Sequence, residues 1–238
     1  MDLKEEEILG SAADQHWYYR SKAAAVTRLL GAYSPTKILD VGAGSGFFSR
    51  YLLRKTFAET AICVDTSYAA AWHTLEANKR IDFRQAIDDV DVDLVLLMDV
   101  LEHVEDDAGL IADYVRKVPT GALFVFSVPA FSFLWSRHDD FLLHKRRYTL
   151  PQLERVVRTA GLTVQSGAYY FGFILPIAAG TRLLERYLPA TTRQARSQLK
   201  RHNPITNAFL AYLCLAELRI LPLNRVAGLT VFCLARKI

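Results

Sequence analysis

The chain has 238 residues, 51% of them hydrophobic, and a formal net charge of +4. This length fits one α/β domain and is short for two independent ones, and so mild a charge does not by itself indicate a nucleic-acid partner. The hydrophobic content exceeds that of an average soluble domain, so we expect some apolar surface to face something other than the core.

Targeting features and cysteine content favour a cytoplasmic location. The first seven residues are acidic and lack the apolar core of a signal peptide, so we expect no export. No stretch reaches the roughly 18 apolar residues that a membrane span requires. Cys63, Cys214 and Cys233 are odd in number and form no CxxC pair, which favours three buried thiols in a reducing compartment.

Hydrophobic patterning predicts strands that alternate with helices along most of the chain. A first helix is expected over residues 11–30, ended by Gly31. Such alternation is typical of an α/β fold with a doubly wound, mostly parallel sheet. The expected strands that follow are 37–41, 61–65, 81–87, 93–98 and 122–128, and the expected helices between them are 47–55, 68–79 and 107–117.

The C-terminal part departs from this alternation. Thr149 and Gln152 form a capping-box pattern that predicts the start of a helix, which Gly161 ends. Two more strands are expected at 162–168 and 229–235, which gives a seven-stranded sheet. We therefore expect a main domain formed by residues 1–168 and 229–238, with residues 169–228 as an apolar and basic helical insertion.

A glycine-rich loop follows the first of these strands. Gly42, Gly44 and Gly46 permit a sharp turn and let a ligand lie close to the amides at the following helix N-terminus. Their Gly-x-Gly-x-Gly spacing differs from the Gly-x-Gly-x-x-Gly fingerprint of dinucleotide-binding proteins. Asp40 precedes the loop, where it can receive a charged amine. Asp65 ends the next strand, where a carboxylate can accept hydrogen bonds from ribose hydroxyls.

Three further motifs accompany this loop. Residues 16–20 read His-Trp-Tyr-Tyr-Arg, and residues 99–103 read Asp-Val-Leu-Glu-His. Residues 134–149 contain Leu-Trp-Ser-x-His-Asp followed by His-x-Arg-Arg-Tyr-Thr. Together with the loop, these motifs resemble the class I S-adenosylmethionine-dependent methyltransferases, and within them a bacterial branch that carries the first and third motifs. The resemblance extends over residues 11–168 and the last strand.

The resemblance implies S-adenosyl-L-methionine as cofactor and S-adenosyl-L-homocysteine as product. It implies that Asp40 and the three glycines hold the methionine half and that Asp65 holds the ribose. Asp88 is the candidate for reading the adenine amine, although its surroundings differ from those in many relatives. In the alternative interpretation, Asp40 only caps a helix and Asp65 is a solvated strand end. The full set of candidate cofactor-binding residues is Tyr19, Arg20, Asp40, Gly42, Ala43, Gly44, Gly46, Asp65, Thr66, Asp88, Asp99 and Val100.

Methyl transfer requires the protein to align the acceptor, exclude water and, for a hydroxyl acceptor, remove a proton. His138, Asp139 and His144 follow the fifth strand, at the edge where open α/β sheets bind ligands. His144 is the preferred proton acceptor, His138 the second candidate, and Asp139 the partner that orients the imidazole. Alternatively, these residues hold a loop closed over the cofactor. The aromatic segment 16–20 is expected to act as a lid. No metal site is expected, because the Cys and His residues lack metal-ligand spacing.

Residues 169–228 combine two apolar segments, 171–179 and 209–215, with a connection that carries six basic residues between positions 182 and 201. Helices that are apolar over much of their circumference must be covered by a partner, by the catalytic domain or by a membrane surface. The basic connection favours contact between residues 170–228 and anionic lipids at the inner face of the membrane. A homodimer interface and a substrate lid are the alternatives.

The sequence thus predicts an O-methyltransferase that acts on a small or lipid-linked acceptor, such as a saccharide or an isoprenoid-type molecule. A dinucleotide-dependent oxidoreductase and a non-catalytic cofactor-binding scaffold are the competing interpretations. A nucleic-acid substrate is not expected, because the Asn/Asp-Pro-Pro-aromatic motif of amino-methylating enzymes is absent after the fourth strand.

Overall fold

The computed structural model describes residues 15–185 and 202–238. Eight strands within these ranges form one sheet in the order β3-β4-β2-β1-β5-β6-β8-β7. Strands β1, β2, β4, β5 and β6 run parallel, whereas β3 is antiparallel to β4, and β8 is antiparallel to both β6 and β7. The strands are β1 Lys37–Val41, β2 Thr60–Val64, β3 Trp72–Glu76, β4 Lys79–Arg84, β5 Leu94–Met98, β6 Leu123–Pro129, β7 Leu162–Tyr170 and β8 Thr230–Lys237.

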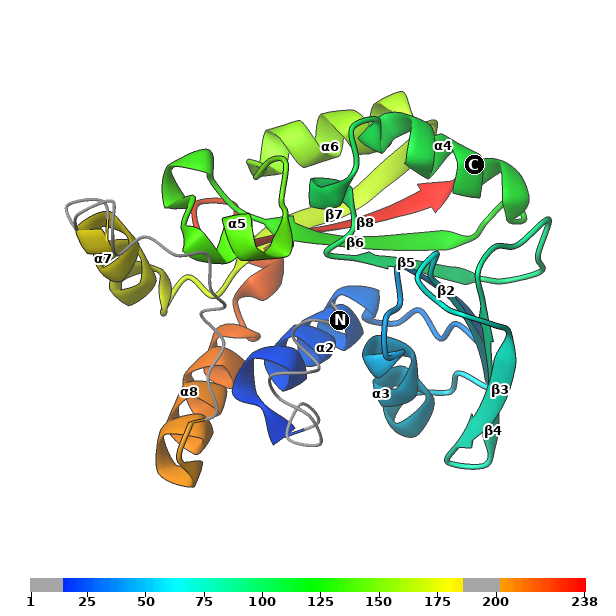
Figure 1. Ribbon diagram of the computed structural model, residues 1–238, viewed down its shortest axis with the longest axis horizontal. Helices are drawn as coiled ribbons and strands as arrows, with labels where there is room; N and C mark the ends of the chain where they lie inside the picture. Colours follow the sequence, from blue (N-terminus) through cyan, green and yellow to red (C-terminus); the bar gives the residue numbers. More distant parts are fainter. Residues whose placement is uncertain (1–14, 186–201) are drawn as a thin grey trace.

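Helices cover both faces of this sheet (Figure 1). Helices α2 and α3 lie on one face, and α4 and α6 lie on the other. The α-helices are α2 Trp17–Leu30, α3 Phe47–Lys55, α4 Asp107–Lys117, α5 Arg137–Leu142, α6 Leu150–Thr159, α7 Leu175–Glu185 and α8 Pro204–Glu217. Short 3-10 turns are η2 Leu101–His103, η3 Ser132–Leu134 and η5 Leu221–Leu223. The mostly parallel α/β sheet is therefore confirmed, with eight strands rather than seven.

The predicted helix over residues 68–79 is wrong. The chain instead forms the antiparallel hairpin β3–β4, in which Ala77 and Asn78 both adopt left-handed φ angles of 51° and 60°. Two such residues form the tight turn that matches the twist of paired strands. Trp72 stacks on Phe83 of β4 at a centroid distance of 4.4 Å. The alanine-rich sequence favours a helix locally, but strand pairing and this aromatic contact decide the conformation.

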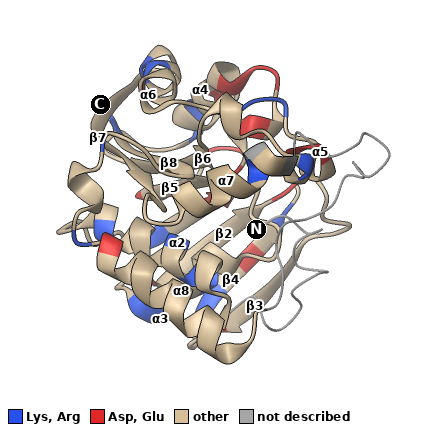
Figure 2. Ribbon diagram, turned by 90° about the vertical axis from the view of Figure 1, so that its left-hand side faces the viewer, with Lys and Arg blue, Asp and Glu red and all other residues tan. Residues whose placement is uncertain are grey.

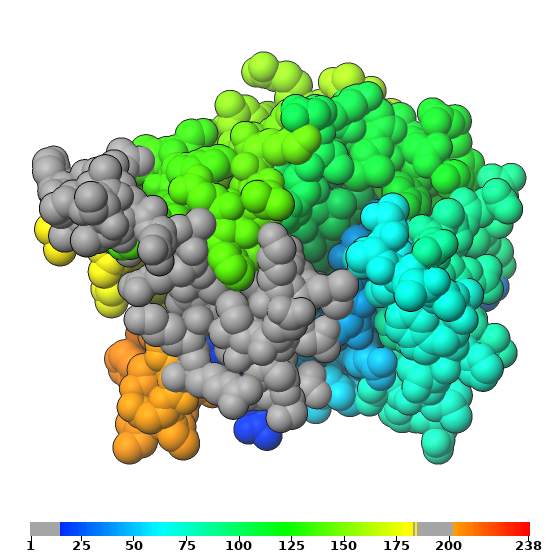
Figure 3. Space-filling view, in the orientation of Figure 1, coloured from blue at the N-terminus to red at the C-terminus, as the bar shows by residue number. Residues whose placement is uncertain are grey.

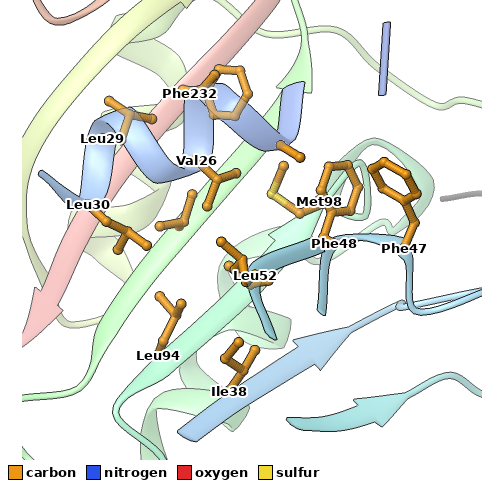
Figure 4. Close-up of a cluster of buried hydrophobic side chains, with 14 of the residues drawn as sticks. Val26, Leu29, Leu30, Ile38, Phe47, Phe48, Leu52, Leu94, Met98 and Phe232 are labelled. Atoms are coloured by element: carbon orange, nitrogen blue, oxygen red, sulfur yellow. The ribbon is translucent and has the colours of Figure 1, made fainter. Parts of the chain in front are cut away.

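Two apolar layers hold the helices to the sheet. Side chains from α2 and α3 meet those of β1 and β5 in the layer shown in Figure 4, where Val26 and Leu52 face Ile38 and Leu94. The central strand β5 is buried over its full length, as expected for a parallel strand covered on both faces. Helix α6 begins at the capping box that the sequence predicts, with Thr149 and Gln152 bonded reciprocally. These layers fix the positions of the loops at the strand ends.

The order of strands reverses between β1 and β5. The chain passes from β1 outward to β2 and β4, and then returns to the other side of β1 to form β5 and β6. In open α/β sheets this switch point, at the carboxyl ends of the strands, is where ligands bind. The glycine loop follows β1 and Asp99 follows β5, so both lie at this edge.

The segment between β7 and β8 contains α7, α8 and η5. Strand β7 extends to Tyr170, whose hydroxyl donates a hydrogen bond of 2.9 Å to the Cys214 carbonyl in α8. The Glu217 carboxylate accepts hydrogen bonds from the backbone of Gly172 and Phe173. These contacts join α8 to the same apolar layer as α2. The division into a main domain and an insertion at 169–228 stays a prediction. Of the six residues of the basic connection, Arg182 lies in α7, and the other five, between 186 and 201, lie outside the described residues, as do residues 11–14 of the first predicted helix.

Within the described residues, no helix combines the length and the apolar character that crossing a bilayer requires. All three cysteines are buried and unpaired, as the sequence predicts.

Candidate active site

The glycine loop adopts the left-handed backbone conformations that its three glycines permit. Gly42, Gly44 and Gly46 adopt φ angles of 65°, 53° and 71°, in the left-handed region that other residues adopt only with strain. A Cβ atom at Gly42 would lie 2.7 Å from a methyl group of Val100, and one at Gly46 would lie 3.0 Å from the Phe83 ring. Glycine is therefore required at these two positions by conformation and by space.

Asp40 lies behind this loop. Its carboxylate is almost fully buried and accepts a hydrogen bond of 2.9 Å from the Ser49 hydroxyl in α3. Burial raises the pKa of Asp40 to about 6, against the opposing effect of the Ser49 hydrogen bond. In this arrangement Asp40 joins β1 to α3 beneath the loop, and its contact with a ligand amine stays a prediction.

Asp65 supports the loop from β2. Its carboxylate accepts a hydrogen bond from the Gly44 amide at 3.0 Å and further hydrogen bonds from the amide and hydroxyl of Ser67. The Tyr68 hydroxyl donates to the Gly44 carbonyl at 2.5 Å. The structure thus brings Asp65 to the glycine loop, as the motif implies, and leaves the neighbouring Thr66 exposed.

Asp99 begins the second half of the site. It is a non-glycine residue with a left-handed φ of 57°, and such strain is concentrated at functional positions. Its carboxylate forms an ion pair with Lys22 from α2 and accepts a weaker hydrogen bond from Ser127 at 3.3 Å. Val100, the next residue, packs against the loop at Gly42.

The sequence gives no indication of the role of Lys22. Its side chain is completely buried, and its ammonium group also donates to the Tyr18 hydroxyl at 3.3 Å. Burial lowers the pKa of Lys22, but the charge and the hydrogen bond of Asp99 outweigh burial, so that the net pKa is raised. Lys22 therefore stays charged and ties helix α2 to the end of β5.

The aromatic motif at the start of α2 is divided between core and pocket. Tyr19 is buried and its ring lies 5.4 Å from that of Phe47, whereas Arg20 is exposed. Trp17 and Tyr18 line a cavity that adjoins Asp99. Asp88, the candidate for adenine recognition, is exposed beyond the end of β4.

This cavity lies between α2, the β6 end, α5 and α7. Asp99, Glu102 and His103 contribute its polar floor, and Ile174, Ala178 and Arg182 contribute a wall from the β7–α7 region. His138, His144 and Arg147 complete it from the segment after β6. All three predicted proton-transfer residues lie in or directly behind this one cavity.

His144 is held by a buried ion-pair network. The Asp139 carboxylate contacts His144 Nδ1 at 2.9 Å and accepts two hydrogen bonds from Arg147, at 2.7 and 2.9 Å. Burial alone would raise the pKa of Asp139, but the hydrogen bonds from His144 and Arg147 hold it well below its usual range. An ionised carboxylate at Nδ1 favours the proton on that nitrogen, so in the neutral imidazole the acceptor is Nε2.

His138 is a weaker base than the sequence suggests. Burial, together with the nearby charge of Arg182, lowers its pKa to about 4, against the opposing charge of Asp139. It is therefore neutral near pH 7, with little tendency to take up a proton. Geometry favours His144 of the two candidates.

Glu102 is a functional candidate that the sequence analysis names only as part of the motif at residues 99–103. Its side chain is fully buried, and neither carboxylate oxygen has a hydrogen-bond partner among the described residues. Burial, followed by the charge of Asp99, raises the pKa of Glu102 well above its usual range. The neighbouring His103 packs edge-to-face on His144, with ring centroids 4.9 Å apart.

Comparison with known proteins identifies the family. The profile of a methyltransferase domain family matches residues 15–166, well over half of the chain. The chain belongs to the S-adenosylmethionine-dependent methyltransferases. This assignment replaces the oxidoreductase and the non-catalytic scaffold that the sequence left open.

Relatives of this methyltransferase support the assignment. A probable S-adenosylmethionine-dependent methyltransferase of Mycolicibacterium smegmatis is 24% identical over 173 residues, which cover 69% of this chain and 66% of that protein. A ubiquinone biosynthesis O-methyltransferase of Xylella fastidiosa is 34% identical over 105 residues, which cover 40% of this chain and 43% of that protein. This methyltransferase thus spans less than two thirds of the length of these relatives.

A solved S-adenosylmethionine-dependent methyltransferase from Archaeoglobus fulgidus shares the fold, with a TM-score of 0.54 and 17% identity over 99% of this chain and 98% of that one. The cofactor fits the features described above. The loop turns through three glycines in the left-handed region, and the Asp65 carboxylate from the end of β2 accepts a hydrogen bond from its Gly44 amide. S-adenosyl-L-methionine is the methyl donor of this enzyme.

Proposed function

We propose that this methyltransferase transfers the methyl group to a hydroxyl oxygen of a small or lipid-linked acceptor, a saccharide or an isoprenoid-type molecule, bound in the cavity beside Asp99. The observation that carries the proposal is the contact of 2.9 Å between His144 Nδ1 and the buried Asp139 carboxylate. It leaves His144 Nε2 available to remove the hydroxyl proton, whereas an amine acceptor with a free lone pair needs no such base.

The cofactor is proposed to lie between the glycine loop and Asp65. Gly42, Ala43, Gly44 and Gly46 offer backbone to the methionine half, and Asp65 offers its carboxylate to the ribose hydroxyls. Asp99 and Val100 follow the adjacent strand β5, so they separate this position from the acceptor cavity. With S-adenosyl-L-methionine bound, its methyl group would pass to the acceptor oxygen while the carbon–sulfur bond breaks and leaves its electron pair on sulfur. His144 would take the hydroxyl proton.

A lipid-linked acceptor is supported by the shape and lining of the cavity. Trp17, Leu142, Ile174 and Leu229 add apolar surface around the polar floor. Part of the wall comes from α7, whose Ile177 and Leu184 are exposed. A chain-like apolar acceptor could therefore run from the polar floor toward α7. The relative named for ubiquinone biosynthesis is an O-methyltransferase, which agrees with transfer to oxygen.

The acceptor class is tested by incubating the purified enzyme with methyl-labelled S-adenosyl-L-methionine and fractionated bacterial extract. We expect label in the organic phase, in a product whose mass spectrum shows an O-methyl group. Heat-treated enzyme is the control. Label confined to the aqueous phase would contradict the lipid-linked acceptor, and an N-methyl product would contradict oxygen as the target.

A membrane surface is the second part of the proposal. Ile205, Phe209 and Tyr212 are spaced along one face of α8 and are 84%, 59% and 70% exposed. No charged residue occurs between Asn203 and Ala216. Helix α8 projects at the lower left of the molecule (Figure 3), and Figure 2 views the same end with α7 and α8 toward the viewer. Such a stripe, which the basic connection precedes in the sequence, suits the headgroup region of anionic lipids.

Flotation with phosphatidylglycerol vesicles tests this surface. We expect the enzyme to float, and the triple variant I205S/F209S/Y212S to remain at the bottom of the gradient. The control is Leu75→Ser, which removes an exposed apolar side chain from the β3–β4 hairpin at the opposite end of the molecule. If wild type and triple variant float alike, lipid contact through α8 is wrong; loss of a dimer in the triple variant, seen by sedimentation without any flotation, would assign the stripe to self-association.

A further inference from the structure

Three ligating side chains meet in the acceptor cavity. Glu102, His103 and His144 each offer one ligand atom, and these atoms all lie within 4.8 Å of one another. Glu102 and His103 belong to η2 after β5, whereas His144 follows α5, so the cluster forms only in the folded chain. The proposed methyl transfer uses His144 and gives no role to the other two.

The Glu102 carboxylate requires a partner. It is completely buried, and neither of its oxygens has a hydrogen-bond partner among the described residues. A buried carboxylate in this state is costly unless a cation or a proton satisfies it. The two neighbouring imidazoles are metal ligands by nature, and they border the cavity together with Glu102.

His144 is oriented as a metal-binding histidine is. Metal-ligating histidines almost always donate their second ring nitrogen to a carboxylate or a carbonyl, which fixes the ring and strengthens the ligand. Here the buried Asp139 carboxylate holds Nδ1, and Arg147 in turn holds that carboxylate through two hydrogen bonds. Because Asp139 engages Nδ1, Nε2 is the nitrogen left to serve as a ligand atom.

We propose that Glu102, His103 and His144 bind a divalent cation, Zn²⁺ in the first place, with a fourth coordination position open to the acceptor cavity. Two histidines and one glutamate are a known ligand set of catalytic zinc, and an open position distinguishes catalytic from structural sites. All three residues line the cavity, so a fourth ligand can enter from it.

The distances permit this coordination with small side-chain movements. Ligand atoms around a tetrahedral zinc with bonds of about 2.1 Å stand about 3.4 Å apart. In the structure the three ligand atoms are 4.8 Å or less from one another. Each pair therefore needs to approach by about 1.4 Å at most to reach the tetrahedral spacing. His103 is only half-buried and lies in a single 3-10 turn, so its ring can supply most of that movement.

The consequence for catalysis rests on the proposed O-methyl transfer. A divalent cation lowers the pKa of a hydroxyl bound to it, so an acceptor oxygen at the fourth position would release its proton to water before it attacks the methyl carbon. In the metal-bound form His144 is a ligand and the cation activates the hydroxyl, whereas in the metal-free form His144 is the base that removes the proton. Glu102 and His103 then become necessary for turnover as well as for metal binding.

Metal binding is tested on the tag-free, chelator-treated enzyme with Co²⁺ as a spectroscopic probe. We expect one Co²⁺ per chain, visible d–d absorption of four- or five-coordinate geometry, and displacement by Zn²⁺. Glu102→Gln keeps the shape of the side chain, and both this variant and His103→Gln should weaken binding by more than about 10-fold. Asp139→Asn should weaken it by about 10- to 100-fold, because it alters the support of His144.

The matched control is His73→Gln, which removes an exposed histidine on β3, far from the cavity. It should leave the Co²⁺ spectrum and affinity unchanged. Absence of the absorption bands in the wild-type protein, or equal affinity in wild type and Glu102→Gln, would overturn the proposal. Because this measurement uses neither cofactor nor acceptor, absence of metal binding would leave the proposed O-methyl transfer standing. An enzyme that binds Co²⁺ but methylates no oxygen would contradict the proposed O-methyl transfer and leave the metal site standing.

Discussion

Replacement of His144 by glutamine is expected to lower kcat by about 10²- to 10⁴-fold, the range typical for loss of a general base. His144 lines the same cavity as Asp99. Its Nδ1 is held by the buried, ionised carboxylate of Asp139. Glutamine keeps hydrogen-bonding capacity toward Asp139 but can neither accept the proton nor serve as an equivalent metal ligand. The affinity for S-adenosyl-L-methionine, measured by calorimetry, should stay within a few-fold of wild type, because the glycine loop is untouched.

His138→Gln is the comparison for this variant. His138 lines the same cavity, but its pKa of about 4 makes it a poor base near neutral pH, so we expect a much smaller loss of turnover. Equal losses in the two variants would show that both histidines act by closing the loop over the site. An enzyme that keeps nearly full turnover without His144 would remove the proposed base altogether.

The largest effect on stability is expected from Lys22→Met. The lysine side chain is completely buried, and its ammonium group pairs with Asp99 within reach of Glu102. Removing one partner of a buried pair leaves an uncompensated charge, which costs about 3–5 kcal/mol. We expect the lower end of this range, about 3 kcal/mol, because the Asp99 side chain keeps 30% of its exposure and can be partly solvated.

Urea unfolding measures this effect as a shift of the midpoint at constant slope. The control is Lys37→Met, since the ion pair of Lys37 with Asp91 is exposed to solvent on both sides and its loss should leave the midpoint unchanged. The double variant K22M/D99N, in which the anion is also neutralised, should recover part of the loss. A Lys22→Met protein with wild-type stability would mean that Asp99 finds full compensation from water.

Local sequence determined much of the site's frame. The helix at Phe47–Lys55, the helix at Asp107–Lys117 and the strand at Lys37–Val41 have the bounds that the sequence predicts. Each is specified by residues that are neighbours in the chain, through periodicity, capping or the left-handed backbone that glycine permits. The pairing of Asp139 with His144 is also local, because the two residues are five positions apart in the chain.

Tertiary structure alone decided the rest. The hairpin Trp72–Arg84 replaces a predicted helix because its strands pair with each other and β4 pairs with β2, and a local pattern does not contain such pairing. The Lys22–Asp99 ion pair joins residues 77 apart, and His144 meets Glu102 and His103, which precede it in the chain by 42 and 41 positions. Ion pairs and metal coordination depend on distances between side chains in space, and a single sequence does not contain these distances. The chain therefore specified its cofactor loop through neighbours, whereas the chemistry of the acceptor cavity arose only when β5, α2 and the segment after β6 met at one edge of the sheet.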